Sequence, residues 1–424
     1  MDVVVGIDVA TAEARALAVD GDGRVHGRGS APLAGPRSPQ PGWHEQDATS
    51  WCPAAAAALA QATVGLSVVA VSVCATSGTV VALDRHGAPT GPALMYNDQR
   101  DRVRWLARNA PVGSRLAHAS DMVVAHLLGH DVPTDWSHAL KSGYDPAELA
   151  WQLDDVPAGF LPQVLPPTTV VGRAGAGYDV SLGMTDGCAS QIAAGAAAPG
   201  RFVSVLGTTL VLKGATESRL VDPTRIVYSH RHPDGWWLPG GASNTGGAAL
   251  AGYDDLAAWD ALAADHGPAR SVLYPLVGTG ERFPFLAPEA RGFEVGWSAD
   301  PADRYRAILE GVAFIERLGY ERLAELGAPP PATVAASGRG SHSSVWNRVR
   351  ATVLGVPLVA APDASTARGA AILAAAGSLH PDLTMATEAM AVTGKVVEPD
   401  PTERERLEQH FSQFVAALAE RGWI

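Results

Sequence analysis

The order of the expected elements at the start of the chain is the feature that most constrains its fold. Residues 2–8 form a nearly unbroken apolar run, which predicts a buried strand. Residues 15–19 predict a second strand that leads into the hairpin sequence Asp20-Gly21-Asp22-Gly23, and a third strand begins at Val25. A dinucleotide-binding fold needs a helix after its first strand and loop. Three consecutive strands therefore exclude that fold.

The second half of the sequence repeats this order. Strands are expected at 202–206, 210–213 and 235–241, with a short turn at 207–209 between the first two. In both halves, helices and further strands follow the three strands. These later elements are a helix at 49–63 and a strand at 68–74 in the first half, and a helix at 302–326, a strand at 334–337 and a helix at 345–354 in the second.

Two copies of a mixed strand, hairpin and helix unit predict a duplicated α/β protein with a cleft between its halves. The stretch 161–177 is rich in proline and glycine and is the natural boundary between them. We therefore expect an N-terminal domain at 1–176 and a C-terminal domain at 177–424.

Composition restricts the partners. Of the 424 residues, 47% are hydrophobic, so sizeable cores are expected. The formal net charge is −12 and no Lys/Arg cluster stands out, which argues against a nucleic-acid or membrane partner. An acidic protein can still bind ATP, because backbone N–H groups and a metal ion hold the phosphates locally.

The N-terminal segment and the cysteines bear on the compartment. The chain enters directly as a strand without a basic segment and an apolar run, and no apolar stretch is long enough to span a bilayer. Cys52, Cys74 and Cys188 lack metal-ligand spacing and do not form an even disulfide set. We expect a cytoplasmic protein in which Cys74 and Cys188 are small buried residues.

Asp186 follows a Gly/Val-rich loop and precedes an apolar, Ala-rich helix. An aspartate in this place is most often an N-cap. A strand then leads to the turn Gly207-Thr208-Thr209, whose composition is typical of a phosphate-binding turn. Together the two features suggest a base placed beside the terminal phosphate of a nucleotide, and the sequence pattern alone leaves both interpretations open.

Short sequences of distinctive composition occur in one order along nearly the whole chain. They are Ala75-Thr76-Ser77-Gly78-Thr79, Tyr96-Asn97, residues 138–146, Thr185-Asp186, Leu206-Gly207-Thr208-Thr209, residues 227–230, 240–247 and 280–284, and Arg350 with residues 353–357. This order resembles one known family, the FGGY carbohydrate kinases. Within it the chain is most similar to the short D-ribulose kinase group of cyanobacteria and plants.

The resemblance implies a duplicated ribonuclease-H-like fold, shared with actin and other sugar kinases. The first domain would form the sugar and phosphate side and the second the nucleotide side, closing over their ligands to exclude water. The implied activity is transfer of a phosphoryl group from ATP, with Mg²⁺, to D-ribulose. Two alternatives stay open: a kinase for D-xylulose or another polyol, and a degenerate sugar- or nucleotide-binding relative. The oligomeric state is also open, with a homodimer as one option.

The resemblance also assigns roles to residues around the transferred phosphoryl group. Asp186 matches the base that accepts the proton of the sugar hydroxyl. Asp8 matches the acid that holds Mg²⁺ directly or through water, although an aspartate at a strand end can simply close a turn. Thr11 matches a phosphate-contacting hydroxyl. Gly207, Thr208 and Thr209 match the second phosphate loop, where a missing Cβ lets backbone N–H groups approach the nucleotide.

Further residues match the binding sites for adenosine and sugar. Gly338, Gly340 and Ser341 match the adenosine loop. Ser77 and Gly78 match the loop that contacts the sugar, whose hydroxyls are recognised chiefly by hydrogen bonds. Asp98, followed by Arg100, fits the family's Trp-x-Asp-x-Arg pattern with Tyr96 in the Trp place. The same two residues could instead form a surface ion pair of little energetic weight.

The chain departs from the family at several of these places. The first phosphate loop carries Ala10 and Glu13 where the family is rich in glycine, and an inward-pointing Glu13 would repel phosphate. The adenosine loop has Arg339 in the place of its middle glycine and Ser343 where Asn is common. The segment 98–121 is shorter than in relatives by about a helix, which puts the identity of the sugar in doubt more than the chemistry.

Overall fold

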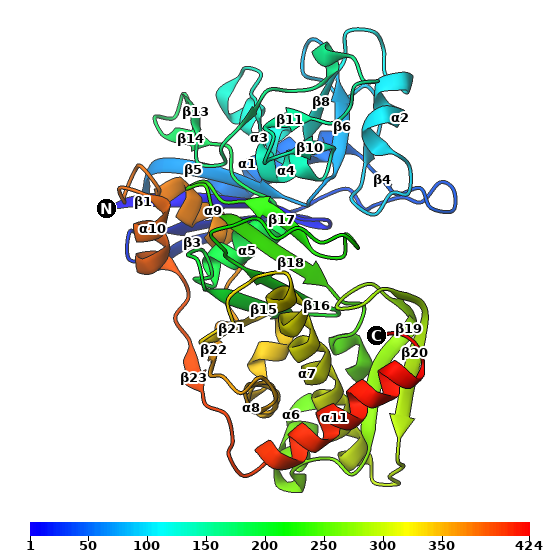
Figure 1. The fold of residues 1–424 in the computed structure, drawn as a ribbon. Coiled ribbons are helices and arrows are strands. Elements are labelled where there is room, and N and C mark those ends of the chain that lie inside the picture. The colour runs from blue at the N-terminus through cyan, green and yellow to red at the C-terminus, as the bar shows by residue number, and fades with distance from the viewer. The chain divides into compact units, whose positions relative to one another are not determined.

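The computed structural model describes all residues, 1–424, and divides into two compact units (Figure 1). Each unit is built from three separate segments of the chain. Unit 1 consists of Met1–Ala193, His230–Gly235 and Ser365–Ala391, and unit 2 of Ala194–Ser229, Trp236–Ala364 and Val392–Ile424.

A six-stranded mixed sheet forms the centre of unit 1, in the order β13-β14-β5-β1-β2-β3. β1 pairs antiparallel with β2, and β2 pairs antiparallel with β3, so the three strands expected at the start of the chain are confirmed. β1 also pairs parallel with β5. The strand bounds are β1 Asp2–Val9, β2 Glu13–Val19, β3 Val25–Pro32, β5 Ser67–Ala75, β13 Val170–Arg173 and β14 Asp179–Ser181.

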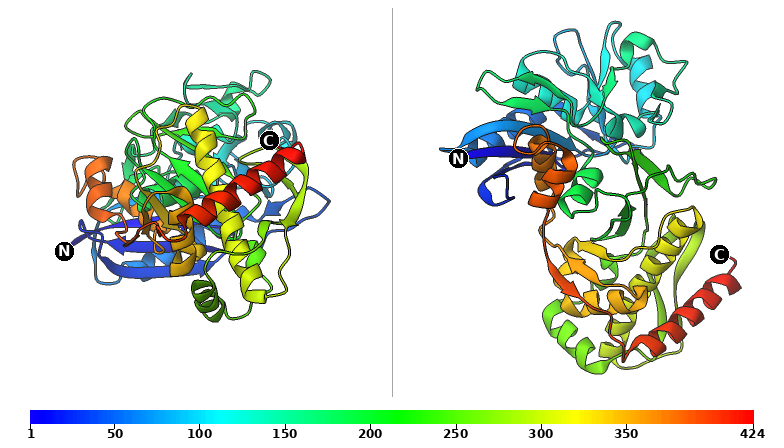
Figure 2. Two further views of the ribbon diagram at one scale, coloured as in Figure 1. Left: turned by 60° about the horizontal axis from the view of Figure 1, so that its bottom comes forward. Right: turned by 60° about the vertical axis from the view of Figure 1, so that its left-hand side comes forward.

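Helices cover this sheet with small side chains. The first helix, α1, is rich in alanine and packs against β2 and β3. Residues from late in the chain also return to the sheet: α9 packs against β1, and Figures 1 and 2 show α9 and α10 (orange) beside β1 (blue). The helices of unit 1 are α1 Trp51–Ala62, α2 Arg102–Asn109, α3 Ala119–Leu128, α4 Trp136–Leu140, α5 Asp186–Ala193, α9 Thr366–Ala375 and α10 Leu383–Met390.

Smaller sheets complete unit 1. A four-stranded sheet has the order β4-β7-β6-β8, and two pairs of short strands, β10-β11 and β12-β9, lie apart from it. Their bounds are β4 Glu45–Gln46, β6 Val80–Leu83, β7 Ala93–Leu94, β8 Arg115–His118, β9 Thr134–Asp135, β10 Tyr144–Asp145, β11 Ala150–Trp151 and β12 Val164–Leu165. Two 3₁₀ turns accompany them, η1 Ala48–Ser50 and η2 Ala158–Phe160.

Unit 2 contains a seven-stranded sheet in the order β17-β18-β16-β15-β21-β22-β23. β15 pairs antiparallel with β16 and parallel with β21, which is the pairing that β1 makes with β2 and β5. The expected duplication is therefore visible in the strand order. The bounds are β15 Phe202–Leu206, β16 Leu210–Gly214, β17 Tyr228–Arg231, β18 Trp237–Ala242, β21 Val334–Ser337, β22 Leu358–Ala360 and β23 Lys395–Val397.

The helices of unit 2 enclose a large apolar core. The long helix α7 buries apolar residues at helical spacing, as its sequence predicts, and α11 (red in Figure 2) packs against it and against the hairpin β19-β20. No helix of the protein has the length and apolar character needed to cross a bilayer. The remaining elements are α6 Leu256–His266, α7 Pro301–Glu325, α8 Ser344–Leu354, α11 Arg404–Glu420, β19 Val272–Glu281, β20 Ala287–Val295, η3 Gly247–Leu250 and η4 Arg339–His342.

The compact units divide the chain differently from the expected domains 1–176 and 177–424. The proline- and glycine-rich stretch 161–177 does not act as a linker, because β13 lies within it and pairs with β14. β14 in turn pairs parallel with β5 and buries Val180, so both strands belong to the sheet of unit 1. α9 and α10, which the expected boundary placed in the second domain, also belong to unit 1.

Candidate active site

Asp8 lies at the end of β1, where the strand is buried on both faces. Asp8 is 4% exposed, and its Oδ1 has no hydrogen-bond partner. Oδ2 lies 3.8 Å from Nη1 of Arg15, which is on the antiparallel neighbour β2. A buried carboxylate oxygen without a donor is rare in folded proteins. Oδ1 of Asp8 is therefore able to accept a bond from a ligand.

Asp186 is the first residue of α5 and is half-buried. Thr185, just before it, bridges to Ala75 at the end of β5, so Asp186 follows an extended segment that lies along the sheet. Oδ1 accepts a hydrogen bond of 2.7 Å from the backbone N–H of Gly187. The N-terminus of a helix favours negative charge. The local structure therefore places this carboxylate where a helix N-terminus favours the charged form that a general base requires.

Close packing of small residues brings the strand of Asp8 and the helix of Asp186 together. A Cβ on Gly6 would lie 1.9 Å from the carbonyl oxygen of Ala367 in α9, so only glycine lets α9 approach β1. A Cβ on Gly369 of α9 would likewise lie 1.9 Å from the carbonyl oxygen of Ala189 in α5. Helix α9 is thus held tightly against both elements that carry the two carboxylates.

The two carboxylates interact electrostatically. Burial raises the pKa of Asp8, and the negative charge of Asp186 raises it further, to about 7 in total. The guanidinium of Arg15 acts in the opposite direction but does not compensate. Two carboxylates in this relation are a strongly negative site, which a divalent cation or a proton would relieve.

The predicted sugar loop follows β5 directly, in the same unit. Oγ of Ser77 is buried and has no hydrogen-bond partner, which leaves it available to a hydroxyl of a ligand. Gly78 has φ +84°, and a Cβ there would lie 3.1 Å from Cβ of Lys141 and 3.2 Å from Nη2 of Arg102. A side chain at Gly78 would therefore be strained and crowded. The binding role of both residues stays a prediction.

Asp98 forms an ion pair with Arg100, as one interpretation of its sequence suggested, but the pair is buried. Its side chain is fully buried, so it is not part of a surface ion pair. Its oxygens accept hydrogen bonds from the backbone N–H of His44 and from Nε and Nη2 of Arg100. The Arg100 guanidinium also stacks on the rings of Trp43 and Trp105, 3.7 and 4.6 Å from their centroids. Asp98 therefore anchors Arg100 and the backbone of His44, and its contact with a sugar stays a prediction.

The first turn, 10–13, connects β1 and β2 and is closed by a bond from the N–H of Ala10 to the carbonyl of Glu13. The carbonyl of Thr11 accepts a bond of 2.8 Å from Nε2 of Gln46. Oε1 of Glu13 accepts a hydrogen bond of 2.7 Å from Nε of Arg15, so the charge of Glu13 is paired on the protein surface. The paired charge of Glu13 would repel a phosphate less than a free carboxylate would. The phosphate contact of Thr11 stays a prediction.

The predicted nucleotide loops meet at the end of β15 in unit 2. A Cβ on Gly338 would lie 2.7 Å from the carbonyl oxygen of Leu206, and one on Gly340 would lie 2.4 Å from its side chain. The turn 207–209 directly follows Leu206. Because β15 and β21 run parallel and end side by side, this turn lies next to the loop that begins at Gly338. A Cβ on Gly207 would meet only the carbonyl of Thr209, at 3.9 Å. The backbone at Gly207 is thus open to a ligand, while Gly338 and Gly340 are needed for packing.

Two residues hold these loops in shape. The hydroxyl of Ser341 donates to the carbonyl of Gly338 at 2.6 Å, so it closes its own turn, and its contact with a nucleotide stays a prediction. Glu281 is 2% exposed and accepts bonds from the hydroxyls of Ser243, Thr245 and Tyr274. The segment that Glu281 holds reaches the turn 207–209, because the N–H of Leu210 donates to the carbonyl of Thr245.

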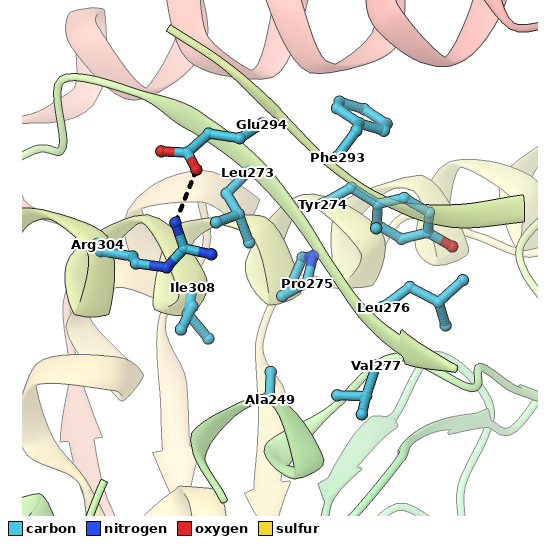
Figure 3. A pocket seen from close by; sticks show the side chains of 11 residues that line it. Ala249, Leu273, Tyr274, Pro275, Leu276, Val277, Phe293, Glu294, Arg304 and Ile308 are labelled. Atoms are coloured by element: carbon cyan, nitrogen blue, oxygen red, sulfur yellow. Dashed lines mark hydrogen bonds and ion pairs between the residues drawn. The ribbon is translucent and has the colours of Figure 1, made fainter. Parts of the chain in front are cut away.

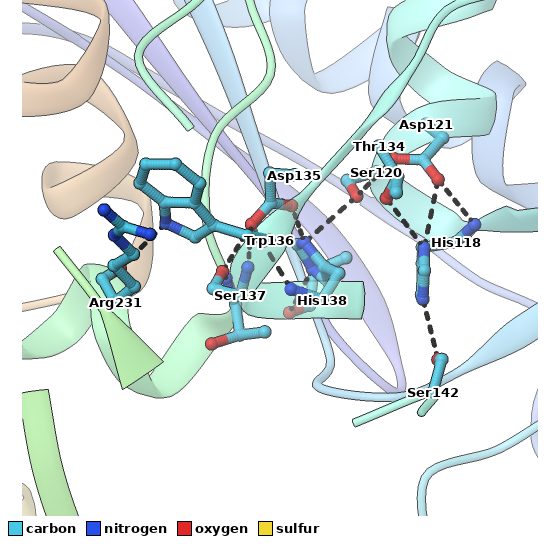
Figure 4. Close-up of polar contacts among 12 residues, drawn as sticks. His118, Ser120, Asp121, Thr134, Asp135, Trp136, Ser137, His138, Ser142 and Arg231 are labelled. Carbon is cyan, nitrogen blue, oxygen red and sulfur yellow. Dashed lines mark hydrogen bonds and ion pairs between the residues drawn. The ribbon is translucent and has the colours of Figure 1, made fainter. Parts of the chain in front are cut away.

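Sequence reasoning gave no role to a buried polar cluster in unit 1 (Figure 4). The cluster lies within and beside the stretch 138–146, which carried part of the family resemblance. Its centre is Asp135, the N-cap of α4, which bonds to Ser137 and His138. The sequence offers only the N-cap position of Asp135 as a signal; the rest depends on contacts between segments far apart in the chain.

Unit 2 also has a surface pocket, shown in Figure 3, between the hairpin β19-β20 and helix α7. Its lining is apolar except for an ion pair between Arg304 and Glu294, at 2.9 Å. None of the predicted site residues contributes to it. We therefore place no part of the candidate site there.

The residues fit Mg²⁺ only as a partly hydrated ion that arrives with phosphates. No group of three or more His, Cys, Asp or Glu residues is arranged to hold a metal. Asp8, with its unpartnered oxygen, and Asp186 offer oxygen ligands of the type that Mg²⁺ prefers. Mg²⁺ commonly binds through one or two carboxylates, waters and substrate phosphates, so these residues are consistent with it.

The duplicated strand order, the carboxylate at the head of a helix and the glycine-hydroxyl turns together define a two-domain α/β sugar kinase. Solved structures share this fold. A structure described as a xyloylose kinase from Brucella ovis has a TM-score of 0.88 at 22% identity, covering 99% of each chain. Xylulose kinase from Rhodospirillum rubrum has a TM-score of 0.86 at 27% identity, covering 99% of this chain and 98% of that one.

The family is identified by sequence. The N-terminal domain of the FGGY family of carbohydrate kinases matches residues 3–105, and its C-terminal domain matches residues 202–378, together more than half of the chain. The chain belongs to the FGGY family of carbohydrate kinases. It is therefore an enzyme, a sugar phosphotransferase, and ATP is the phosphoryl donor that the family implies.

Individual relatives are similar at a lower level. Xylulose kinase of Streptomyces coelicolor is 28% identical, covering 88% of this chain and 87% of the relative. Xylulose kinase of Streptomyces rubiginosus is 26% identical and covers 81% of both. Glycerol kinase of Gloeobacter violaceus is also 26% identical. The predicted family is confirmed, whereas the D-ribulose kinase group within it is not.

Proposed function

We propose that this enzyme phosphorylates a ketopentose with ATP, and that Asp186 is the general base. The observation that carries the proposal is the pair of carboxylates in unit 1. Asp186 heads a helix whose N-terminus favours its charge, and Asp8 lies close enough for that charge to raise its pKa. A carboxylate that is ionised and half-exposed can accept the proton of a sugar hydroxyl as it attacks the γ-phosphate.

Each remaining group has a role in this proposal. The hydroxyl of Ser77, buried without a partner, would donate to the sugar or accept from it. The open backbone at Gly207, with Thr208 and Thr209, would hold the phosphates, and the loop around Gly338 would hold the nucleoside. Mg²⁺, when bound, would offset the charge of the phosphates, and Asp8 is the residue best placed to hold it.

Two ketopentoses are supported for different reasons. The names of the two Streptomyces relatives favour D-xylulose. The motif order described above favours D-ribulose. Both are 2-ketoses with a terminal primary hydroxyl, so one site chemistry serves either sugar. Their stereochemistry differs at a single carbon, which hydrogen bonds to hydroxyls can distinguish.

A coupled assay of ADP release tests the proposal. The panel should contain D-xylulose and D-ribulose, with glycerol and gluconate as smaller and acidic acceptors. We expect kcat/KM for one ketopentose to exceed that for glycerol and gluconate by at least about tenfold. Turnover of glycerol or gluconate alone would reject the ketopentose. Product analysis by ³¹P NMR should show a phosphomonoester, which separates transfer to the sugar from plain hydrolysis of ATP.

A further inference from the structure

Asp135 connects, through two side chains, the two segments that carry the predicted base and the predicted sugar loop. It is buried, and it caps α4 by accepting bonds from the backbone N–H groups of Ser137 and His138, at 2.7 and 3.2 Å. An N-cap explains these two bonds. It does not explain the side chains of Ser137 and His138, which reach away from the helix.

The first connection runs to the base. Oγ of Ser137 donates to Oδ1 of Asp135 at 2.5 Å, and it accepts a bond of 3.0 Å from the backbone N–H of Thr185. Thr185 is the residue immediately before Asp186, and its carbonyl accepts the first bonds of α5 from Cys188 and Ala189. The Ser137 hydroxyl therefore fixes the point at which the helix of Asp186 begins.

The second connection runs to the sugar loop. The His138 imidazole bonds to Asp135 through Nδ1, and its Nε2 donates to the carbonyl of Ala75 at 3.3 Å. Ala75 ends β5 and precedes Ser77 by two residues. Figure 4 shows Asp135 between the side chains of Ser137 and His138. Because Ala75 and Thr185 also bridge to each other, both strand ends are fixed by one carboxylate.

The charge state makes this connection rigid. Burial alone would lower the pKa of His138, but the charge of Asp135 and their hydrogen bond outweigh it and raise that pKa. The same interactions lower the pKa of Asp135 against the effect of its burial. A buried, charged and hydrogen-bonded pair has few alternative arrangements.

We infer that Ser137, held by Asp135, is a positioning residue for Asp186, and that His138 sets the sugar loop relative to it. The inference rests on the proposed function, since positioning matters only if Asp186 reacts. Ser137 contacts neither substrate nor phosphate in this scheme; it acts through the backbone of Thr185. A base displaced by about 1 Å can cost about 10²-fold in rate.

The test compares Ser137→Ala with a matched control, Ser181→Ala. Ser181 lies on β14, five residues before Asp186, and its buried hydroxyl has no partner. We expect Ser137→Ala to lower kcat about 10- to 100-fold with KM for ATP unchanged, and Ser137→Thr, which keeps the hydroxyl, to recover most of it. Ser181→Ala should stay within about twofold of wild type. An unchanged kcat for Ser137→Ala, or a loss seen only in KM for ATP, overturns the inference.

Hydrogen–deuterium exchange of the substrate-free protein gives a readout that does not depend on activity. The amide of Thr185 should exchange at least about tenfold faster in Ser137→Ala than in Ser181→Ala, because its acceptor is lost. Equal exchange in the two variants overturns the inference. Wild-type protein that turns over no ketopentose would count against the proposed function alone. If Ser137→Ala does not fold, Ser137→Cys keeps the shape with a weaker acceptor, and wild-type exchange at Thr185 in that variant overturns the inference.

Discussion

The turn 10–13 in unit 1 and the turn 207–209 in unit 2 occupy equivalent positions in the two copies of the fold. Each connects an antiparallel pair whose first strand also has a parallel partner, β5 or β21. The first turn lies between Asp8 and Glu13, two carboxylates that share Arg15. The second contains no charge and has an open glycine. The two units therefore share the strand pairing around the turn, while the charges of the turn residues differ.

The neighbouring groups that support the two turns also differ: one turn is supported by a side chain, the other by backbone groups. In unit 1 the amide of Gln46 holds the carbonyl of Thr11, and Oε1 of Gln46 accepts from the indole N–H of Trp51. Both turns have backbone bonds, but in unit 2 the neighbouring segment supports the turn through its backbone: the N–H groups of Gly247 and Ala248 donate to the carbonyls of Gly207 and Thr208. A turn held through its backbone presents its remaining N–H groups in a fixed direction, as phosphate binding requires.

The largest effect on activity should come from the carboxylates of unit 1. Asp186→Asn should lower kcat by about 10²–10⁴-fold, the usual contribution of a positioned base, because an amide does not accept the proton. Calorimetric binding of a nucleotide should remain within about threefold of wild type. Asp179→Asn, which removes an exposed carboxylate on β14, is the matched control and should not affect kcat. A loss of only a few-fold in Asp186→Asn would show that Asp186 is a helix cap.

The uncharged turn 207–209 of unit 2 can be tested with two glycines that differ in their surroundings. A Cβ on Gly246 would lie 2.6 Å from the backbone of Thr209, so Gly246→Ala should destabilise unit 2 by about 1–3 kcal/mol. Gly207→Ala meets no close atom and should leave Tm unchanged, yet raise KM for ATP about tenfold by blocking the phosphate approach. Thermal unfolding and steady-state kinetics measure the two effects. Unchanged ATP kinetics in Gly207→Ala would remove this turn from the nucleotide site.

The raised pKa of Asp8 predicts a pH-dependent difference in stability. The folded protein binds the Asp8 proton more tightly than the unfolded chain, so the contribution of Asp8 to stability is present at low pH and is lost as pH rises from about 4 to 7. In metal-free buffer, Asp8→Asn should therefore become more stable than wild type over that range, by on the order of 1–3 kcal/mol above pH 7. Urea unfolding at several pH values measures this, with the exposed Asp22→Asn as control. A pH-independent difference would contradict the shift.

The smallest effect concerns Glu13. Since its carboxylate already pairs with Arg15 and is partly exposed, Glu13→Gln should change KM for ATP by less than about threefold. Assays at low and high salt should agree closely, because a screened surface pair contributes little. A large gain in ATP affinity would show that Glu13 does oppose phosphate, and that the first turn has lost part of its function in this protein.

Local patterns predicted much of this structure. The apolar run at 2–8, the turn at 20–23 and the spacing in 302–326 correspond to β1, the β2-β3 hairpin and α7, because each depends on neighbouring residues. The composition of 161–177 was misleading. Its glycines and prolines suggest a linker, yet β13 there is held by pairing with β14, which no local pattern reveals.

The site was predictable only where the chain itself brings residues together. Asp186 at the start of a helix and Gly207 at a turn follow from local sequence. The stacking of Arg100, the ion-pair partner of Asp98, on Trp43 and Trp105 could not be predicted, because the two tryptophans lie on different segments. The same holds for the contact between Ser137 and Thr185, which joins residues far apart along the chain.

The return of α9 to the first sheet has a consequence for synthesis of the protein. A growing chain exposes the face of β1 around Gly6 until residue 375 has left the ribosome, because the helix that covers it comes from the last sixth of the sequence. A fragment cut at the stretch 161–177 would keep that apolar surface uncovered and would tend to aggregate. Expression of the first half alone is thus a poor route to an isolated unit 1, whereas a fusion that joins residues 230–235 and 365–391 to a fragment ending at 193 contains all three of its segments.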